Sequence, residues 1–247
     1  MLLKTATLST SDSMCSRERY HLIDALRGLS VVLMLGYHFG VTLIFQGLAP
    51  EGLIYNPLLD FLEPVFAGLF ILISGMAGRF SRGNVRRGLI VLACAMGVTA
   101  VSLLPFINLN IWFGILHFLG LSMLIYGLFS KPLNKIPLSL GAPVFLALFI
   151  AGYIIFPVKT EGGNLLYWLG FDGSNFLSGD YFPFLKWFPL FLLGSQIGSP
   201  VKEHRLPRWF YSFNMPFLPF VGRHALIVYL FHQPVFYGFT ALLLLFL

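Results

Sequence analysis

A histidine stands in the middle of one of the most apolar stretches of this chain. His38 lies within SVVLMLGYHFGVTLIF, residues 30–45. An imidazole is costly to bury in hydrocarbon, and titratable groups in membrane helices normally face a protein interior or a wet cavity. Arg27 precedes His38 by eleven residues, close to three helical turns, so both side chains share one helix face, about 16 Å apart along the axis. Asp24 lies on the same face, one turn earlier. The spacing predicts a face with a cation near one membrane surface and a base near the midplane.

Other polar side chains are predicted to reach a similar depth. His117 lies six residues into its apolar block, in IWFGILHFLG, and His232 lies nine residues after Arg223, in VYLFHQPV. Asp60 and Glu63 stand at the outer end of the second apolar block. We therefore expect a polar cavity shared by the first, second, fourth and last of these blocks. A histidine in such a cavity has the chemistry of a general base or of a nucleophile.

Each of these groups also has a structural alternative. A histidine in a membrane helix often serves as a hydrogen-bond partner between helices, and this applies most directly to His232, which Gln233 and Pro234 follow. Asp180 precedes the segment YFPF and could cap a helix there. The spacing leaves open whether His38 or His117 would do the chemistry.

The composition requires an integral membrane protein. Hydrophobic residues make up 57% of the 247 positions and charged residues 11%, against about 45–50% and about 25% in soluble domains. Seven apolar blocks each approach the roughly 20 residues that a membrane-spanning helix needs. They are residues 28–48, 61–78, 88–106, 111–129, 137–157, 182–199 and 216–247. We predict an all-α polytopic membrane helix bundle of about seven transmembrane helices. A short polar tail, residues 1–20, precedes the single transmembrane domain, residues 21–247. Prolines in the last block predict a short lead-in and a kinked span.

Basic residues in alternate connections set the predicted orientation. The N-terminal segment and the second, fourth and sixth connections are basic, with Lys4, Arg17, Arg19, Arg27, Arg79, Arg82, Arg86, Arg87, Lys131, Lys135, Lys202, Arg205 and Arg208. Short basic loops stay in the cytoplasm, which predicts a cytoplasmic N-terminus and an external C-terminus.

The second connection, RFSRGNVRRG, is the densest cluster of these charges. Arg79, Arg82, Arg86 and Arg87, together with Arg27, have the chemistry of a phosphate clamp, because guanidinium groups bind phosphate with two parallel hydrogen bonds. The alternative is that these arginines only fix the topology and contact anionic lipids. The two cysteines give no metal-binding pattern, so no metal is expected, and neither is a nucleic-acid partner.

The residues resemble a known family when taken in order. The segments that carry the resemblance are IDALRGLSVVLMLGYHF, FAGLFILISGMAGRFSR, FGILHFLGLSMLI, DYFPFLKWFPLFLLG and VGRHALIVYLFHQPV. Together they resemble the heparan-α-glucosaminide N-acetyltransferase catalytic-domain family of bacterial membrane proteins, over about residues 23–236. The spacing of Arg27 and His38 also resembles the R-x10-H motif of the broader acyltransferase-three superfamily.

The resemblance implies a multi-pass acyltransferase of the bacterial inner membrane. It would move an acetyl group from cytoplasmic acetyl-CoA to a hydroxyl or amine of a saccharide or other acceptor on the outer side. The arginines would hold the nucleotide of the donor, and Glu63, Asp60 and Asp180 would line the outer mouth. Membrane lipids are the remaining expected partners.

One departure from the family concerns the catalytic histidine. The lysosomal enzyme that names the family has a histidine in the non-cytoplasmic stretch after its first span, whereas residues 39–57 here contain none. His38 or His117 would therefore take this role, with Glu63 and Asp180 beside it. The rival function is a proton-coupled small-molecule transporter, because histidines and carboxylates also form proton relays. The sequence shows neither the inverted repeats nor the paired broken helices typical of transport sites.

Overall fold

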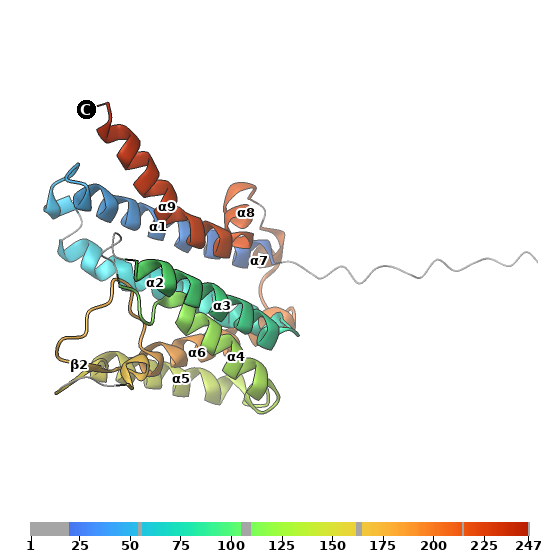
Figure 1. The fold of residues 1–247 in the computed structure, drawn as a ribbon. Coiled ribbons are helices and arrows are strands. Elements are labelled where there is room, and N and C mark those ends of the chain that lie inside the picture. The colour runs from blue at the N-terminus through green and yellow to red at the C-terminus, as the bar shows by residue number, and fades with distance from the viewer. Residues whose placement is uncertain (1–19, 54–55, 105–109, 162–164, 214, 247) are drawn as a thin grey trace, which may run out of the picture.

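The computed structural model describes residues 20–53, 56–104, 110–161, 165–213 and 215–246. In these residues the fold consists almost entirely of helices (Figure 1). The long helices are α1 (His21–Phe45), α2 (Pro57–Phe80), α3 (Asn84–Ser102), α4 (Ile115–Leu133), α5 (Leu138–Ile155), α6 (Phe184–Lys202) and α9 (Ala225–Leu244). The shorter elements are η1 (Glu51–Leu53), β1 (Val158–Thr160), η2 (Tyr167–Leu169), β2 (Phe171–Gly173), α7 (Arg208–Ser212) and α8 (Phe217–Arg223).

The seven long helices correspond to the seven predicted blocks, and the all-α membrane bundle is confirmed. Six of them, α1 to α5 and α9, are long and apolar enough to cross a membrane. The seventh, α6, is less apolar because it contains Lys186, Gln196 and two prolines. It packs between α2 and α5, so neighbouring helices rather than lipid cover much of its surface. The predicted tail, residues 1–20, lies outside the described residues except for Tyr20.

The last predicted block is divided as its prolines suggest. The short helix α8 ends at Arg223, and α9 begins at Ala225 after His224. The strands β1 and β2 were not predicted. They pair in parallel, Val158 with Phe171 and Thr160 with Gly173, in the connection between α5 and α6.

Glycines let the helices of this bundle approach closely. A Cβ atom placed on Gly75 of α2 would lie 2.0 Å from the carbonyl oxygen of Phe191 in α6. A Cβ on Gly28 of α1 would lie equally close, 2.0 Å, to the carbonyl oxygen of Leu218 in α8. Close backbone approach at small residues is how membrane helices gain packing energy, since lipid supplies no hydrophobic drive between them.

The helices run roughly alongside one another and leave two distinct ends (Figure 1). Each helix in the series α9, α1, α2, α6 and α5 packs against the next one. The helices α3 and α4 pack together beside α2. The turns after α2, α4 and α6 lie at one end, which we call the basic end because the arginines and lysines of the second, fourth and sixth connections lie there. The opposite end carries η1, the two strands and the end of α9. The positive-inside rule predicts that the basic end faces the cytoplasm.

Candidate active site

His38 and His232 meet where α1 packs against α9. Their ring centroids are 5.0 Å apart, and the ring planes make an angle of 47°. Within one turn of this contact, the hydroxyl of Thr42 donates to the side-chain oxygen of Gln233 at 3.4 Å. The aromatic pair Phe39 and Phe236, with centroids 5.1 Å apart, holds the same interface. The two helices are thus fixed in a register that places one imidazole against the other.

The hydrogen bonds of His232 determine its tautomer. Nδ1 lies 2.5 Å from the carbonyl oxygen of Tyr229, one turn back along α9. A carbonyl oxygen only accepts, so Nδ1 carries the hydrogen and the Nε2 atom of the neutral ring keeps its lone pair. Nε2 is buried and has no hydrogen-bond partner. Three rings pack around His232: His38, Tyr229 and Phe236. Of these, His38 is the ring with an N–H group that can donate to Nε2 of His232.

Asp180 links the start of α4 to α9. Its Oδ2 atom accepts the backbone N–H of Ile115 and the hydroxyl of Tyr229, both at 2.9 Å. Burial raises the pKa of this carboxyl above its ordinary value, and the two hydrogen bonds oppose that shift. The carboxylate therefore caps the N-terminus of α4. The structural alternative from the sequence placed this cap at the helix that begins with YFPF, but the N-cap of that helix, α6, is Pro183. Gly114 makes room for this contact, because a Cβ there would lie 2.2 Å from Oδ2.

Glu63 approaches the same region from α2. It interacts with Tyr37, the neighbour of His38 on α1, and lies within electrostatic range of Asp180 and Asp60. Both Glu63 and Asp60 are exposed. Residues from α1, α2 and α9 and from the connection before α6 therefore converge near the end opposite the basic end.

The cleft beside this cluster is apolar, in contrast to the polar cavity that the sequence suggested. It measures about 470 Å³ and lies between the outer halves of α1 and α2. Tyr37 supplies its hydroxyl, and the other lining residues are Leu33, Gly36, Phe39, Gly40, Leu43, Leu53, Leu59, Leu62 and Phe66. Its lining includes Tyr37 and Phe39, the two chain neighbours of His38, but neither His38 nor His232.

The contacts of His117 are with Thr99 of α3 and with Phe113. Its Nε2 atom lies 3.2 Å from the hydroxyl of Thr99 in α3, and its ring packs on Phe113 at a centroid distance of 5.8 Å. The side chain is only 6% exposed. The hydroxyl of Thr99 itself donates to the carbonyl oxygen of Ile111. His117 thus joins α3 to α4, which is the structural role that the sequence left open.

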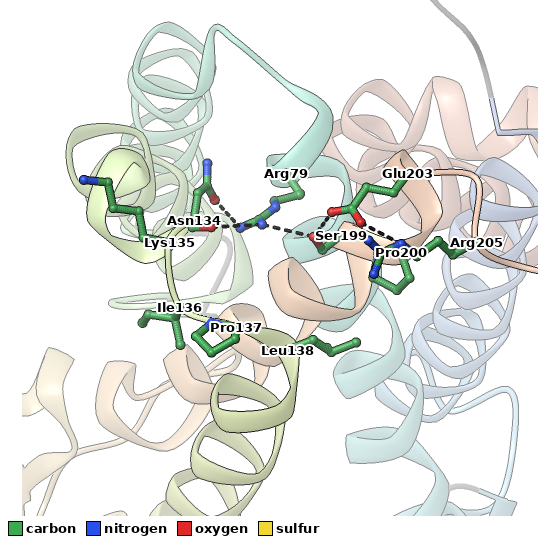
Figure 2. A pocket seen from close by; sticks show the side chains of 10 residues that line it. All are labelled: Arg79, Asn134, Lys135, Ile136, Pro137, Leu138, Ser199, Pro200, Glu203 and Arg205. Atoms are coloured by element: carbon green, nitrogen blue, oxygen red, sulfur yellow. Dashed lines mark hydrogen bonds and ion pairs between the residues drawn. The ribbon is translucent and has the colours of Figure 1, made fainter.

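The arginines of the basic end fall into two groups. Arg27 pairs with Asp24 at 3.1 Å and lies in electrostatic range of Arg87, whose side chain is exposed. Arg82 and Arg86 are exposed as well. Arg79 points elsewhere: it donates to the side chain and the carbonyl oxygen of Asn134, after α4, and to Ser199 of α6 (Figure 2).

Sequence reasoning missed three polar contributors to the cluster: Tyr37, Thr42 and Tyr229. Tyr229 precedes His232 by three residues, a spacing that places both on one helix face and could have drawn attention to it. Tyr37 directly precedes His38. Within the described residues, no group of three or more His, Cys, Asp or Glu side chains is arranged to hold a metal ion.

Comparison with known proteins identifies the family. No curated protein and no solved structure matches the chain. The sequence model described as heparan-alpha-glucosaminide N-acetyltransferase, catalytic, matches residues 19–234. This match spans well over half of the chain and contains all seven long helices apart from the last turns of α9. The chain therefore belongs to the heparan-alpha-glucosaminide N-acetyltransferase catalytic family, whose members are acetyltransferase-type membrane enzymes.

Proposed function

We propose that this protein transfers an acetyl group from cytoplasmic acetyl-CoA to a saccharide hydroxyl or amine at the outer face of the bacterial inner membrane. The family supports transferase chemistry. The observation that carries the proposal is the His38–His232 contact: a half-buried imidazole packs against a second imidazole, on the same helix as Arg27. The chain neighbours of His38, Tyr37 and Phe39, line an apolar cleft between α1 and α2.

The donor would enter from the basic end. Arg87 lies within electrostatic range of Arg27, and Arg82 and Arg86 extend the positive surface into solvent. The rise from Arg27 to His38 is about 16 Å, a length that an extended pantetheine arm can cover. Arg79 points toward Asn134 and Ser199, and not toward Arg27 of α1, so we leave it out of this clamp.

His38 would act as the general base. It takes the proton from the acceptor hydroxyl or amine while the acceptor oxygen or nitrogen attacks the thioester carbonyl. The C–S bond then breaks, and the thiolate leaves with the proton from His38, so that free coenzyme A and neutral imidazole are restored. Direct acylation of His38, followed by transfer to the acceptor, uses the same groups.

His232 would position His38 without touching the substrate. Its tautomer leaves Nε2 as an acceptor buried beside His38. A hydrogen bond from one nitrogen of His38 to this atom would leave the other nitrogen unprotonated and directed at the reacting atoms. Asp180 contributes by fixing Tyr229, whose carbonyl oxygen holds His232. Glu63, at the exposed edge, would contact the acceptor.

Acetyl transfer by the purified protein tests the proposal. The full chain in lipid nanodiscs would be given isotopically labelled acetyl-CoA with glucosamine or a glucosamine-terminated oligosaccharide. The release of free coenzyme A thiol and the mass of the acceptor would be measured. We expect His38→Ala to lower kcat/KM by at least about 100-fold, the usual contribution of a general base. His21→Ala, which removes an exposed histidine at the basic end of the same helix, is the matched control.

Two results would count against the assignment. Turnover retained in the His38→Ala protein would remove this residue from the mechanism. Proton-coupled uptake of the amino sugar into proteoliposomes, without any acetylated product, would favour the transporter in place of the enzyme.

A further inference from the structure

A second cavity opens at the basic end, on the far side of α2 from His38. It measures about 300 Å³ and lies between the end of α2, the turn from α4 to α5 and the end of α6 (Figure 2). Because α2 packs between α1 and α6, this cavity is separate from the proposed active site.

The polar lining of the cavity carries a net positive charge. Arg79, Lys135 and Arg205 contribute three positive charges and Glu203 one negative charge, which leaves an excess of two. The negative charge is already compensated, because Nε of Arg205 lies 3.0 Å from Glu203 at the exposed rim. Arg79 and Lys135 are the lining cations outside the Arg205–Glu203 pair.

Arg79 is held in place by neutral oxygens. One of its NH2 groups donates to the carbonyl oxygen of Asn134 at 3.2 Å and to the hydroxyl of Ser199 at 3.1 Å, and the other donates to the side chain of Asn134. These three bonds use three of the five guanidinium N–H groups. The positive charge is thus fixed in position at the cavity wall by direct partners that carry no charge. Ser199 in turn donates to Oε1 of Glu203 at 2.9 Å (Figure 2), so this carboxylate lies one hydrogen bond beyond Arg79 and is itself paired with Arg205. The remaining N–H groups of Arg79 favour an anionic ligand.

The start of α5 adds to this positive character. Its first residue, Leu138, lines the cavity, and its N-cap, Pro137, offers no side-chain hydrogen bond. The first N–H groups of an 18-residue helix carry a partial positive charge and lack partners within the helix. Phosphate is the anion that such an arrangement of backbone N–H groups and arginine binds best.

We propose that this cavity binds a phosphate group, either from the headgroup of an anionic lipid or from a soluble phosphate ester. Arg79 would give the fixed contact, and Lys135 would close over the anion from the turn after α4. A ligand there would join the ends of α2, α4 and α6 at the cytoplasmic surface. The inference does not depend on the acyltransferase proposal.

Lys135→Gln tests the site with Lys131→Gln as its matched control. Both lysines are exposed at the same end, but only Lys135 lines the cavity. Arg79 is not the variant of choice, because it connects three helices and its loss would disturb folding. In nanodiscs that contain phosphatidylglycerol, native mass spectrometry would count retained lipid. In nanodiscs of phosphatidylcholine alone, calorimetry would measure binding of inorganic pyrophosphate.

We expect Lys135→Gln to weaken binding about tenfold, as the loss of one charge-assisted hydrogen bond would, and Lys131→Gln to have little effect. A selective loss of retained phosphatidylglycerol identifies the lipid headgroup as the source, and a selective loss of pyrophosphate binding identifies a soluble phosphate. Equal losses in the two variants, or no loss in either arm, would overturn the proposal, because binding would then reflect only general surface charge or be absent.

Discussion

The imidazole of His38 packs against that of His232 across the α1–α9 interface, with the ring centroids 5.0 Å apart. The second ring is fixed by the carbonyl oxygen of Tyr229, and its Nε2 atom is buried without a partner. A buried acceptor that lacks a hydrogen bond costs about 1–3 kcal/mol. Under the proposed mechanism, this acceptor would take a hydrogen bond from His38 while His38 gains and loses a proton.

The first prediction concerns the role of His232. We expect His232→Leu to lower kcat for acetyl transfer by about tenfold to 100-fold while KM for acetyl-CoA stays unchanged, because a positioning residue acts on the base and not on substrate binding. His232→Gln should recover part of this loss, since its side-chain oxygen can reach the position of Nε2. Steady-state kinetics in nanodiscs would measure both variants. Equal activity of the Leu and Gln proteins would show that only the shape of the side chain matters.

The second prediction separates His117 from His38. His117 bonds to Thr99 between α3 and α4, so we expect His117→Leu to reduce stability by about 1 kcal/mol or more and to leave kcat/KM within a few-fold of wild type. Thermal unfolding and acetyl transfer would be measured on the same preparation. A loss of activity comparable to that of His38→Ala, in a protein that unfolds at the wild-type temperature, would assign the chemistry to His117.

The third prediction concerns the donor clamp. Arg87→Gln, and the double replacement of Arg82 and Arg86 by Ala, should raise KM for acetyl-CoA more than they lower kcat. All three arginines are exposed, and Arg87 should have the larger effect per residue because it lies in electrostatic range of Arg27. Kinetics at two salt concentrations would reveal the charge contribution, which screening reduces. An unchanged KM would leave these arginines with their topological role only.

The sequence predicted the helices well and the contacts between them poorly, for a physical reason. Membrane thickness and apolar length are properties of one segment at a time, so the block at residues 61–78 falls within α2 and the block at 137–157 overlaps α5. Depth along a helix follows in the same way, and it placed His38, His117 and His232 in the membrane interior. Rotation about the helix axis does not follow, because it depends on the neighbouring helices.

That rotation is why two histidines at similar depth have different partners. His117 faces Thr99 of α3, whereas His38 faces α9. The spacing of residues within each block does not indicate which neighbouring helix the histidine faces. Asp180 illustrates the same limit in a loop. Its cap on Ile115 joins residues 65 positions apart, and a local pattern cannot indicate such a contact.

The fourth prediction is a pH dependence of stability that arises from Asp180. Burial raises the pKa of this carboxyl above its ordinary value of 3.8 in the folded protein. The folded state therefore holds the proton more tightly than the unfolded state, and stability from this group is lost as pH rises from 3.8 through the raised pKa. In Asp180→Asn the amide oxygen can still accept from Ile115 and Tyr229 and does not titrate. We expect the melting temperature of Asp180→Asn relative to wild type to be higher at pH 7.5 than at pH 4.

A control separates titration from hydrogen bonding at this position. Asp180→Ala removes the oxygen that accepts the hydrogen bonds from Ile115 and Tyr229. It should be less stable than Asp180→Asn at every pH, by about 1 kcal/mol for each lost bond. Differential scanning fluorimetry across the pH range would compare the three proteins. A difference between wild type and Asp180→Asn that is constant with pH, or that reverses, would contradict the raised pKa.

The fifth prediction tests the close packing of α2 on α6. Gly75→Ala places a Cβ atom 2.0 Å from the carbonyl oxygen of Phe191. Because that neighbour is backbone, the two helices must move apart, and the packing lost along the interface should cost several kcal/mol, in the range of severe overpacking. Gly97→Ala in α3 is the control: a Cβ there meets nothing within 4 Å, and alanine favours a helix over glycine by about 1 kcal/mol. We expect Gly75→Ala to lower the melting temperature and the yield of folded protein, and Gly97→Ala to maintain or raise both. Equal stability of the two variants would mean that α2 and α6 can separate without loss of stability.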